Sequence, residues 1–112
     1  MSLFLLQKRD QVKAIEREAL RQIALEKLRQ ALQRHLPEQA VGVYGSILVA
    51  GRFRLDSDID IALEIPPATD SLYALKSLMT EATGYEVDVC ILQETRLKEA
   101  IMSKGERWIE SV

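Results

Sequence analysis

Two aspartates, one residue apart, interrupt an otherwise apolar run. The run reads Asp58-Ile59-Asp60-Ile61-Ala62-Leu63. Side chains two positions apart on a strand point to the same face, so Asp58 and Asp60 are predicted to project together, away from the isoleucines that face the core. Two carboxylates this close raise each other's pKa unless a cation neutralises them. Mg²⁺, a hard ion that binds carboxylate and phosphate oxygens, is the cation that this pattern favours.

A third carboxylate follows in a similar setting. The segment Glu86-Val87-Asp88-Val89-Cys90 alternates, and it predicts a further strand over residues 86–92. If that strand pairs beside the first, Asp88 joins Asp58 and Asp60, where it could complete a metal shell or accept the proton of an incoming hydroxyl. Cys90 is predicted to be a small buried filler, because Mg²⁺ does not favour sulfur ligands.

A Gly-Ser pair lies at the end of the preceding apolar segment, a short loop before the aspartates. Gly45 lets the backbone approach a phosphate closely, and a helical turn predicted over residues 47–50 would direct free N–H groups toward it beside the Ser46 hydroxyl. Arg52 and Arg54 lie between the turn and the aspartates, and either could reach a phosphate oxygen. Together these residues predict a phosphoryl-transfer site that holds phosphates and Mg²⁺.

The rest of the chain must provide the scaffold. Helical periodicity predicts helices over residues 10–36, from 69–71 to 84, and over 95–105. Strands are predicted over residues 40–44, 59–65 and 86–92, and Trp108-Ile109 is either a final edge strand or a docking tail. The second helix is expected to bury Leu72, Leu75, Leu78, Met79 and Ala82, and the third Leu97, Ala100 and Ile101. The order predicts an α/β (α+β) fold, a small mixed β-sheet flanked by helices with a long N-terminal helix. Residues 1–112 are expected to form one domain, with 1–36 as the N-terminal helix and 40–112 as the catalytic core.

Composition limits the classes of protein. The chain has 112 residues, 47% of them hydrophobic and 29% charged, as in folded globular proteins. Its single cysteine excludes an intrachain disulfide and fits a reducing cytoplasm, and no apolar run approaches the roughly 20 residues that span a bilayer. We therefore expect a cytoplasmic protein with no membrane contact. Residues 37–112 hold thirteen acidic and seven basic residues, so direct nucleic-acid binding is not expected.

These residues resemble the nucleotidyltransferase (polymerase beta-like) superfamily, and most closely its minimal MNT proteins encoded beside HEPN-domain toxins. The superfamily pattern is an apolar strand, Gly-Ser, a spacer and an Asp-x-Asp between apolar residues. Here it reads Val43-Tyr44-Gly45-Ser46, eleven residues, then Asp58-Ile59-Asp60-Ile61. The spacer is one residue longer than in typical minimal members, and Ala50-Gly51 stands where Arg-Gly is usual. The resemblance covers roughly residues 40 to 110.

The resemblance implies a polymerase beta-like fold and a Mg²⁺-dependent nucleotidyltransferase with ATP as co-substrate. It implies these roles: metal binding and catalysis by Asp58, Asp60 and Asp88, and triphosphate binding by Gly45 and Ser46, with Arg52 or Arg54 in place of the usual arginine. It also implies an antitoxin of a type VII toxin–antitoxin system, which transfers AMP to a tyrosine of its cognate HEPN ribonuclease toxin. The alternatives are a non-catalytic antitoxin that masks the toxin by binding, and a nucleotidyltransferase acting on a small molecule or RNA.

Overall fold

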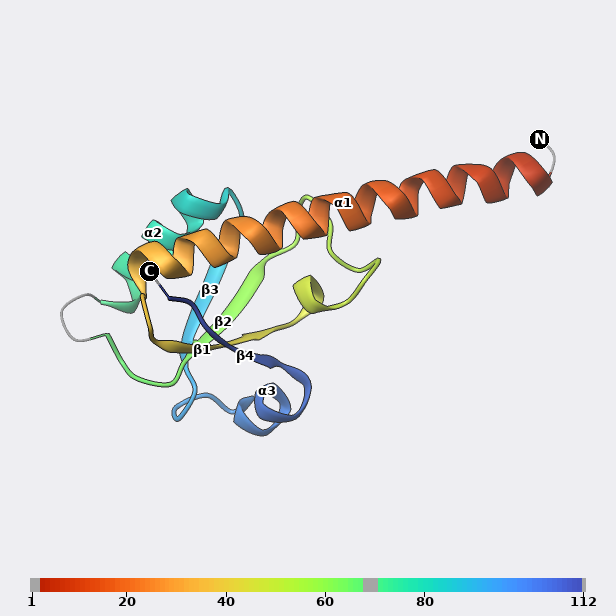
Figure 1. The fold of residues 1–112 in the computed structure, drawn as a ribbon. Helices are drawn as coiled ribbons and strands as arrows, with labels where there is room; N and C mark the ends of the chain where they lie inside the picture. The colour runs from red at the N-terminus through yellow and green to blue at the C-terminus, as the bar shows by residue number, and fades with distance from the viewer. Residues whose placement is uncertain (1–2, 68–70, 112) are drawn as a thin grey trace.

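The computed structural model describes residues 3–67 and 71–111 (Figure 1). Its elements are α1 (Leu3–His35), β1 (Ala40–Tyr44), the 3-10 turn η1 (Ser46–Leu48), β2 (Ile59–Leu63), α2 (Leu72–Thr83), β3 (Val87–Ile91), α3 (Lys98–Lys104) and β4 (Glu106–Ile109). The predicted mixed fold with a long N-terminal helix is confirmed, and Trp108-Ile109 belongs to an edge strand. Of the three residues proposed to begin the second helix, Ser71 caps α2 with its side chain, and Thr69 and Asp70 lie outside the described residues.

The four strands form one mixed sheet in the order β3-β2-β1-β4. β1 is antiparallel to both β2 and β4, whereas β2 and β3 are parallel. A parallel pair needs a crossover connection, and α2 provides it. β2 ends at Leu63, two residues before the predicted end, close to the Pro66-Pro67 pair that has no N–H to donate to a ladder.

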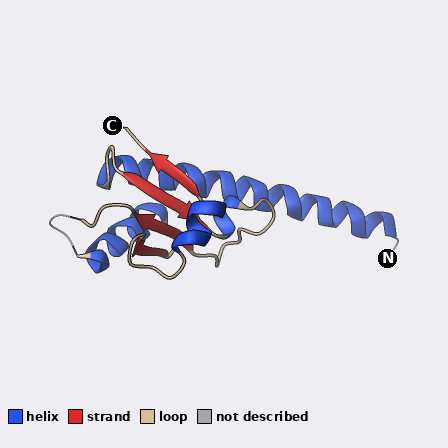
Figure 2. Ribbon diagram, turned by 90° about the horizontal axis from the view of Figure 1, so that it is seen from below, coloured by secondary structure: helices blue, strands red, loops and turns tan. Residues whose placement is uncertain are grey.

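Helices cover the two faces of the sheet unequally. α1 and α2 pack on one face, where they enclose the main core with the inward residues of the strands, which include Val41, Val43, Ile59, Ile61 and Val87. α3 packs on the opposite face through a smaller cluster of Ile101, Ala62 and Leu92. Figure 2 shows α3 in front of the sheet and α1 behind it. The α3 face is therefore more open than the α1 face.

Several predicted core positions are wrong. In α2 the buried residues are Leu75, Met79 and Thr83, spaced by four, while Leu78 is exposed and Ala82 lies on the same outer side. In α3 Ile101 is buried, but Leu97 and Ala100 are exposed, because this seven-residue helix meets the sheet along one narrow line.

The loop before β2, residues 52–57, contains a core residue. Phe53 is fully buried, and its ring lies 5.1 Å from that of Tyr85 between centroids. Burying an aromatic side chain of this size stabilises the fold by roughly 1.5–3 kcal/mol. The loop between η1 and β2 is therefore anchored to the core at Phe53.

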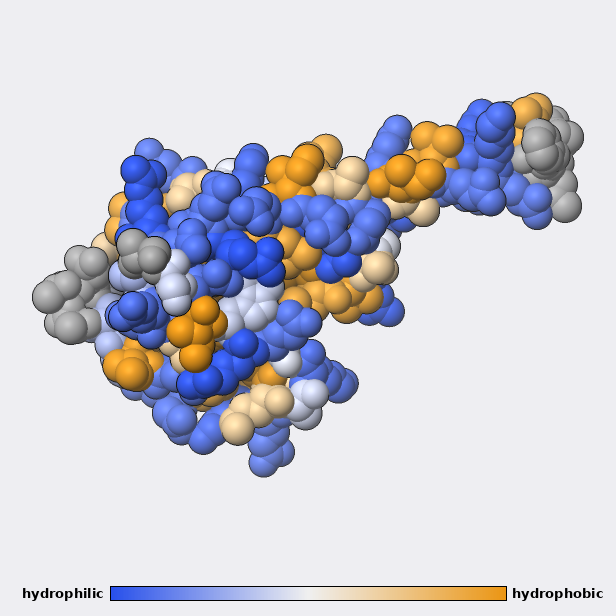
Figure 3. Space-filling model, viewed as in Figure 1, coloured by the Kyte–Doolittle hydropathy of each residue, from blue (hydrophilic) through white to orange (hydrophobic). Residues whose placement is uncertain are grey.

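α1 begins at Leu3, seven residues before the predicted start, because no glycine or proline interrupts the helix formers of residues 3–35. Its C-terminal half buries Ala24, Leu28, Ala31 and Leu32, and its N-terminal half projects beyond the sheet (Figure 1). The molecule is accordingly elongated, with extents of 58 × 27 × 23 Å. Figure 3 shows hydrophobic patches along the projecting part, and among the described side chains of α1 the large apolar ones that are exposed are Leu5, Val12, Ile15 and Ile23. No helix in the described part of the chain has the length and apolar character needed to cross a membrane.

Candidate active site

Asp60 and Asp88 lie side by side on the open face of the sheet. They are Cα partners in the parallel β2–β3 ladder, and Tyr44 of β1 is the partner of Asp60 on the other side. Ile59 and Ile61 are fully buried on the opposite face, as the alternation predicts. Asp58 precedes the first residue of β2 and is exposed. The structure thus places the three predicted carboxylates at one corner of the sheet.

The neighbouring charges act on Asp60. Partial burial and, after it, the negative charges of Asp88 and Asp58 raise the pKa of Asp60 to about 6. A bound cation would relieve both effects, so these oxygen donors suit Mg²⁺. Among the described residues, however, no three His, Cys, Asp or Glu side chains are already gathered closely enough to hold a metal ion.

Lys76 of α2 neutralises Asp88. Its Nζ lies 3.2 Å from Asp88 Oδ1 and 3.5 Å from Glu86 Oε1. The hydrogen bond to Asp88 is the main reason that the pKa of Lys76 is raised. Asp88 therefore has a counter-charge from the protein itself. Sequence reasoning missed Lys76, although it is the single basic residue of the helix that leads into β3.

Gly45 joins the turn predicted to bind phosphate to the carboxylates. Its φ of 87° lies in the region that favours glycine, and a Cβ added there would come 2.6 Å from Asp60 Oδ2. The predicted helical turn over residues 47–50 is displaced, because η1 runs over Ser46–Leu48 and so begins one residue earlier and ends two residues earlier. The Leu48 N–H donates to the Gly45 carbonyl at 3.1 Å, which closes a 3-10 turn directly after Gly45.

A pocket of about 300 Å³ opens beside this turn. Its lining residues are Tyr44, Gly45, Ser46, Leu48, Val49, Arg52 and Lys104. Of the two arginines proposed to meet phosphate, Arg52 lines the pocket, whereas Arg54 is not among the lining residues and is exposed. Sequence reasoning missed Lys104, the last residue of α3, because only the return of β4 beside β1 brings it to the turn.

Cys90 and Tyr44 fill the sheet surface behind the carboxylates. The Tyr44 hydroxyl lies 3.5 Å from Cys90 Sγ, and that thiol donates to the Ile61 carbonyl at 3.7 Å. Burial, followed by the contact with Cys90, raises the pKa of Tyr44. Cys90 is half-buried, consistent with the predicted filler role.

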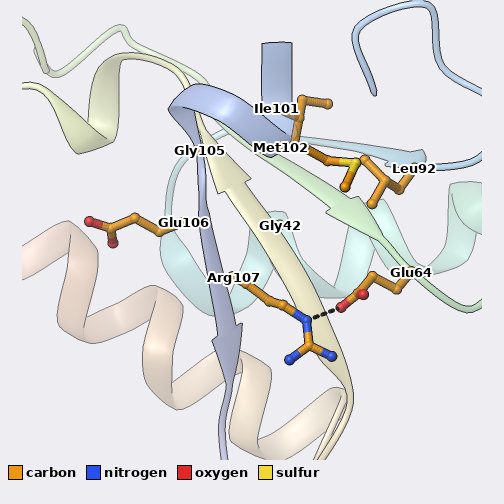
Figure 4. Close-up of a pocket in the computed structure, with 8 residues that line it drawn as sticks. All are labelled: Gly42, Glu64, Leu92, Ile101, Met102, Gly105, Glu106 and Arg107. Carbon is orange, nitrogen blue, oxygen red and sulfur yellow. Dashed lines mark hydrogen bonds and ion pairs between the residues drawn. The ribbon is translucent and has the colours of Figure 1, made fainter. Parts of the chain in front are cut away.

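A second hollow of about 150 Å³ lies between α3 and the strands (Figure 4). Gly42, Leu92, Ile101 and Met102 contribute its apolar part. At its edge Arg107 Nε donates to Glu64 Oε2 at 2.7 Å, so these two charges satisfy each other. None of the predicted site residues lines this hollow.

The fold agrees with a family comparison. A family model described as polymerase beta, nucleotidyltransferase matches residues 26–111. That match covers most of the chain, and the chain therefore belongs to the polymerase beta nucleotidyltransferase family. Residues 1–25 lie outside the matched region. A search of curated proteins finds no significant match.

Two solved structures are similar in fold. One is described as a toxin-antitoxin with AMP-PNP, with 22% sequence identity and a TM-score of 0.56 over 75% of this chain and 72% of the other. The second is described as the toxin-antitoxin MntA-HepT, with 21% identity and a TM-score of 0.53 over 79% of this chain and 72% of the other.

Proposed function

We propose that this chain is a Mg²⁺-dependent protein adenylyltransferase that transfers AMP from ATP to a tyrosine of a cognate HEPN-domain toxin, and so acts as its antitoxin. The observation that carries the proposal is the contact between Gly45 and Asp60. It sets the phosphate-binding turn directly against the aspartate that pairs with Asp88 in the sheet. A phosphate and a carboxylate-bound cation can then meet at one point, as phosphoryl transfer requires.

The residues have separate roles in this proposal. Asp58, Asp60 and Asp88 would hold the cation, which neutralises phosphate charge when bound. Gly45 and Ser46 provide the close backbone approach and the hydroxyl for the triphosphate, and Arg52 and Lys104 pair with its oxygens from the pocket wall. The geometry supports Arg52 over Arg54 as the substitute for the arginine that is usual immediately before Gly51, where this chain has Ala50.

The transfer step exchanges one bond at phosphorus for another. The acceptor tyrosine oxygen attacks the α-phosphorus of ATP, and the bond from that phosphorus to the pyrophosphate oxygen breaks with its electron pair. The hydroxyl proton passes to Asp88 or, where Asp88 instead holds the cation, to solvent water. The outward orientation of this sheet face leaves access for an acceptor that belongs to another protein.

The toxin partner is supported by the two similar structures, both of which are described as toxin-antitoxin assemblies, one of them with AMP-PNP. We further propose that the chain acts in the cytoplasm as one domain, with residues 40–112 as the catalytic core. ATP is the proposed nucleotide, and no membrane or nucleic acid is needed.

The proposal is tested by incubating the protein with ATP, Mg²⁺ and the toxin, and then measuring the intact mass of the toxin. We expect added AMP with the wild-type protein and none with the Asp58→Asn, Asp60→Asn double variant. Asp56→Asn, an exposed aspartate of the same loop, is the matched control and should transfer normally. No added AMP, or equal transfer by the double variant, would contradict the proposal.

Masking by binding alone is a second candidate. The pairing of Asp88 with Lys76, which gives this carboxylate a counter-charge from the protein itself, favours it. In cells that express both proteins at equal levels, a masking antitoxin with both aspartates changed to asparagine would still neutralise the toxin. An adenylyltransferase with the same changes would not.

A further inference from the structure

One side chain of α1 reaches into the phosphate-binding turn. Arg21 Nη1 donates to the carbonyl oxygen of Ile47 at 3.0 Å, across 26 residues of sequence. The Arg21 side chain is only 15% exposed, and Ile47 is fully buried. A hydrogen bond from a charged group at such a site is stronger than one between neutral groups at the surface.

Glu18 holds the guanidinium in place. Arg21 Nε donates to Glu18 Oε2 at 3.0 Å, and Nη2 donates to Oε1 at 2.7 Å, so the pair is bidentate. The pKa of Glu18 falls to about 2, mainly because of hydrogen bonding from Arg21 and next because of a hydrogen bond from Gln22. Because Glu18 holds the planar guanidinium through Nε and Nη2, the N–H donor on Nη1 has a defined direction.

The acceptor of this hydrogen bond is a critical group of the turn. A peptide unit is planar, so fixing the Ile47 carbonyl also fixes the N–H of Leu48 in the same unit. That N–H closes η1 by donating to the Gly45 carbonyl at 3.1 Å. Arg21 therefore acts on Gly45 through two successive hydrogen bonds, the first to Ile47 and the second from Leu48 to Gly45. Arg21 itself is not among the residues that line the pocket.

We propose that Arg21 is a positioning residue that clamps the phosphate-binding turn from outside the family-matched region, and this rests on the proposed function of that turn. Residues 26–111 match the family, and Arg21 precedes them. A short 3-10 turn has weak hydrogen-bond geometry of its own. This one also belongs to a spacer of eleven residues with Ala50 before Gly51, so it lacks an arginine of its own at that point. Arg21 gives the turn a cationic hydrogen-bond partner from α1 instead.

The test compares Arg21→Met with Arg29→Met. Arg29 is also on α1, but it pairs with Glu110 and stacks over the Trp108 ring, away from η1. In the ligand-free protein, Arg21→Met should exchange the amide hydrogens of Leu48 and Val49 about tenfold faster, as expected for the loss of one charged hydrogen bond. Arg29→Met should leave these two amides unchanged.

The same variants are then assayed with ATP. Arg21→Met should raise the KM for ATP about tenfold and leave kcat within about twofold, because the clamp acts on binding geometry and not on the carboxylates. Arg21→Lys should recover part of the affinity, and Glu18→Gln should give a smaller loss than Arg21→Met. Glu18→Gln also keeps the guanidinium, so it provides a measurement if Arg21→Met folds poorly.

Equal amide exchange in Arg21→Met and wild type, or an unchanged KM for ATP, would overturn the clamp. So would equal effects of the Arg21 and Arg29 variants on both readouts. If the wild-type protein transfers no AMP, the proposed function fails, but the exchange comparison in ligand-free protein still decides whether Arg21 orders the turn.

Discussion

The carboxylate half and the phosphate half of the candidate site are held by different kinds of contact. Asp60 and Asp88 are placed by backbone pairing, since each occupies a fixed register position in the β2–β3 ladder. The turn after Gly45 is held by side chains, namely Arg21 of α1 through its hydrogen bond and the turn's own buried Ile47, while Phe53 anchors the loop that follows. A ladder position is maintained by the whole sheet, whereas the turn depends on a few separate contacts. The carboxylates should therefore determine whether transfer occurs, and the turn how well ATP binds.

Removing a carboxylate should have the largest effect. Asp60→Asn should lower the rate of AMP transfer by about 10³-fold or more, because charge stabilisation at the phosphate is the main catalytic term. Single-turnover transfer at saturating ATP measures this, with Asp56→Asn as the control. A loss that disappears at saturating ATP would show that Asp60 acts on binding, contrary to the division between the two halves.

Gly45 is the point where the two halves meet, and a substitution there should affect both. Gly45→Ala would place a Cβ 2.6 Å from Asp60 Oδ2 at a φ of 87°. We expect a loss of about 2–3 kcal/mol of unfolding free energy and roughly 100-fold in transfer. Chemical denaturation and the transfer assay measure the two effects.

Gly51→Ala is the matched control for this substitution. Gly51 also has a positive φ, of 84°, but an added Cβ would meet nothing within 4 Å. The difference between the two alanine variants isolates the overlap with Asp60. Combining Gly45→Ala with Asp60→Ala should recover part of the stability but no transfer, since the clashing carboxylate and the catalytic group are one side chain. Equal destabilisation by Gly45→Ala and Gly51→Ala would contradict the close approach of Gly45 to Asp60.

The pocket cations should have an intermediate effect, confined to the phosphate half. Arg52→Gln and Lys104→Gln should each weaken ATP binding about tenfold, the effect expected when one phosphate contact is lost. Arg54→Gln is the control, since Arg54 does not line the pocket. Titration calorimetry with a non-hydrolysable ATP analogue gives the dissociation constants. A larger loss from Arg54→Gln than from Arg52→Gln would reverse the assignment of the substitute arginine.

The smallest effect concerns the stability of the ligand-free protein and its pH dependence. The pKa of Asp60 rises from 3.8 to about 6 on folding, so the folded state binds this proton more tightly and loses stability as pH rises between those values. Asp60→Asn should abolish that loss, so above pH 6 the variant should be more stable to unfolding than the wild type by about 1 kcal/mol. This figure is reduced for the partial exposure of the carboxyl. Thermal melts at pH 4 and pH 7.5 compare the two proteins. If the variant were stabilised equally at both pH values, ionisation of Asp60 would not be the cause of the pH dependence.

The contrast between backbone pairing and separate side-chain contacts also explains how much of the fold and site the sequence can predict. The alternation of Asp58 to Leu63 and of Val87 to Ile91 predicts which side chains share a face, and β1 begins and ends where predicted. The contacts of Arg21 and Lys104 join elements distant in the chain, and that of Lys76 crosses from α2 to the next strand, so no local pattern encodes them. Apolar spacing wrongly predicts that Leu78 and Leu97 are buried, because it shows a helix face but not which part of that face meets the sheet.

The projecting half of α1 gives the molecule an uneven shape, with a helix of 33 residues along a longest extent of 58 Å. Such a body rotates faster about its long axis than end over end. Backbone N–H bonds of a helix lie nearly along the helix axis, so those of α1 are reoriented mainly by the slower end-over-end motion. Nuclear spin relaxation should therefore give longer apparent correlation times for amides of α1 than for amides of the strands. That contrast reports the shape of the isolated chain without any ligand, and it should change when another protein covers the helix.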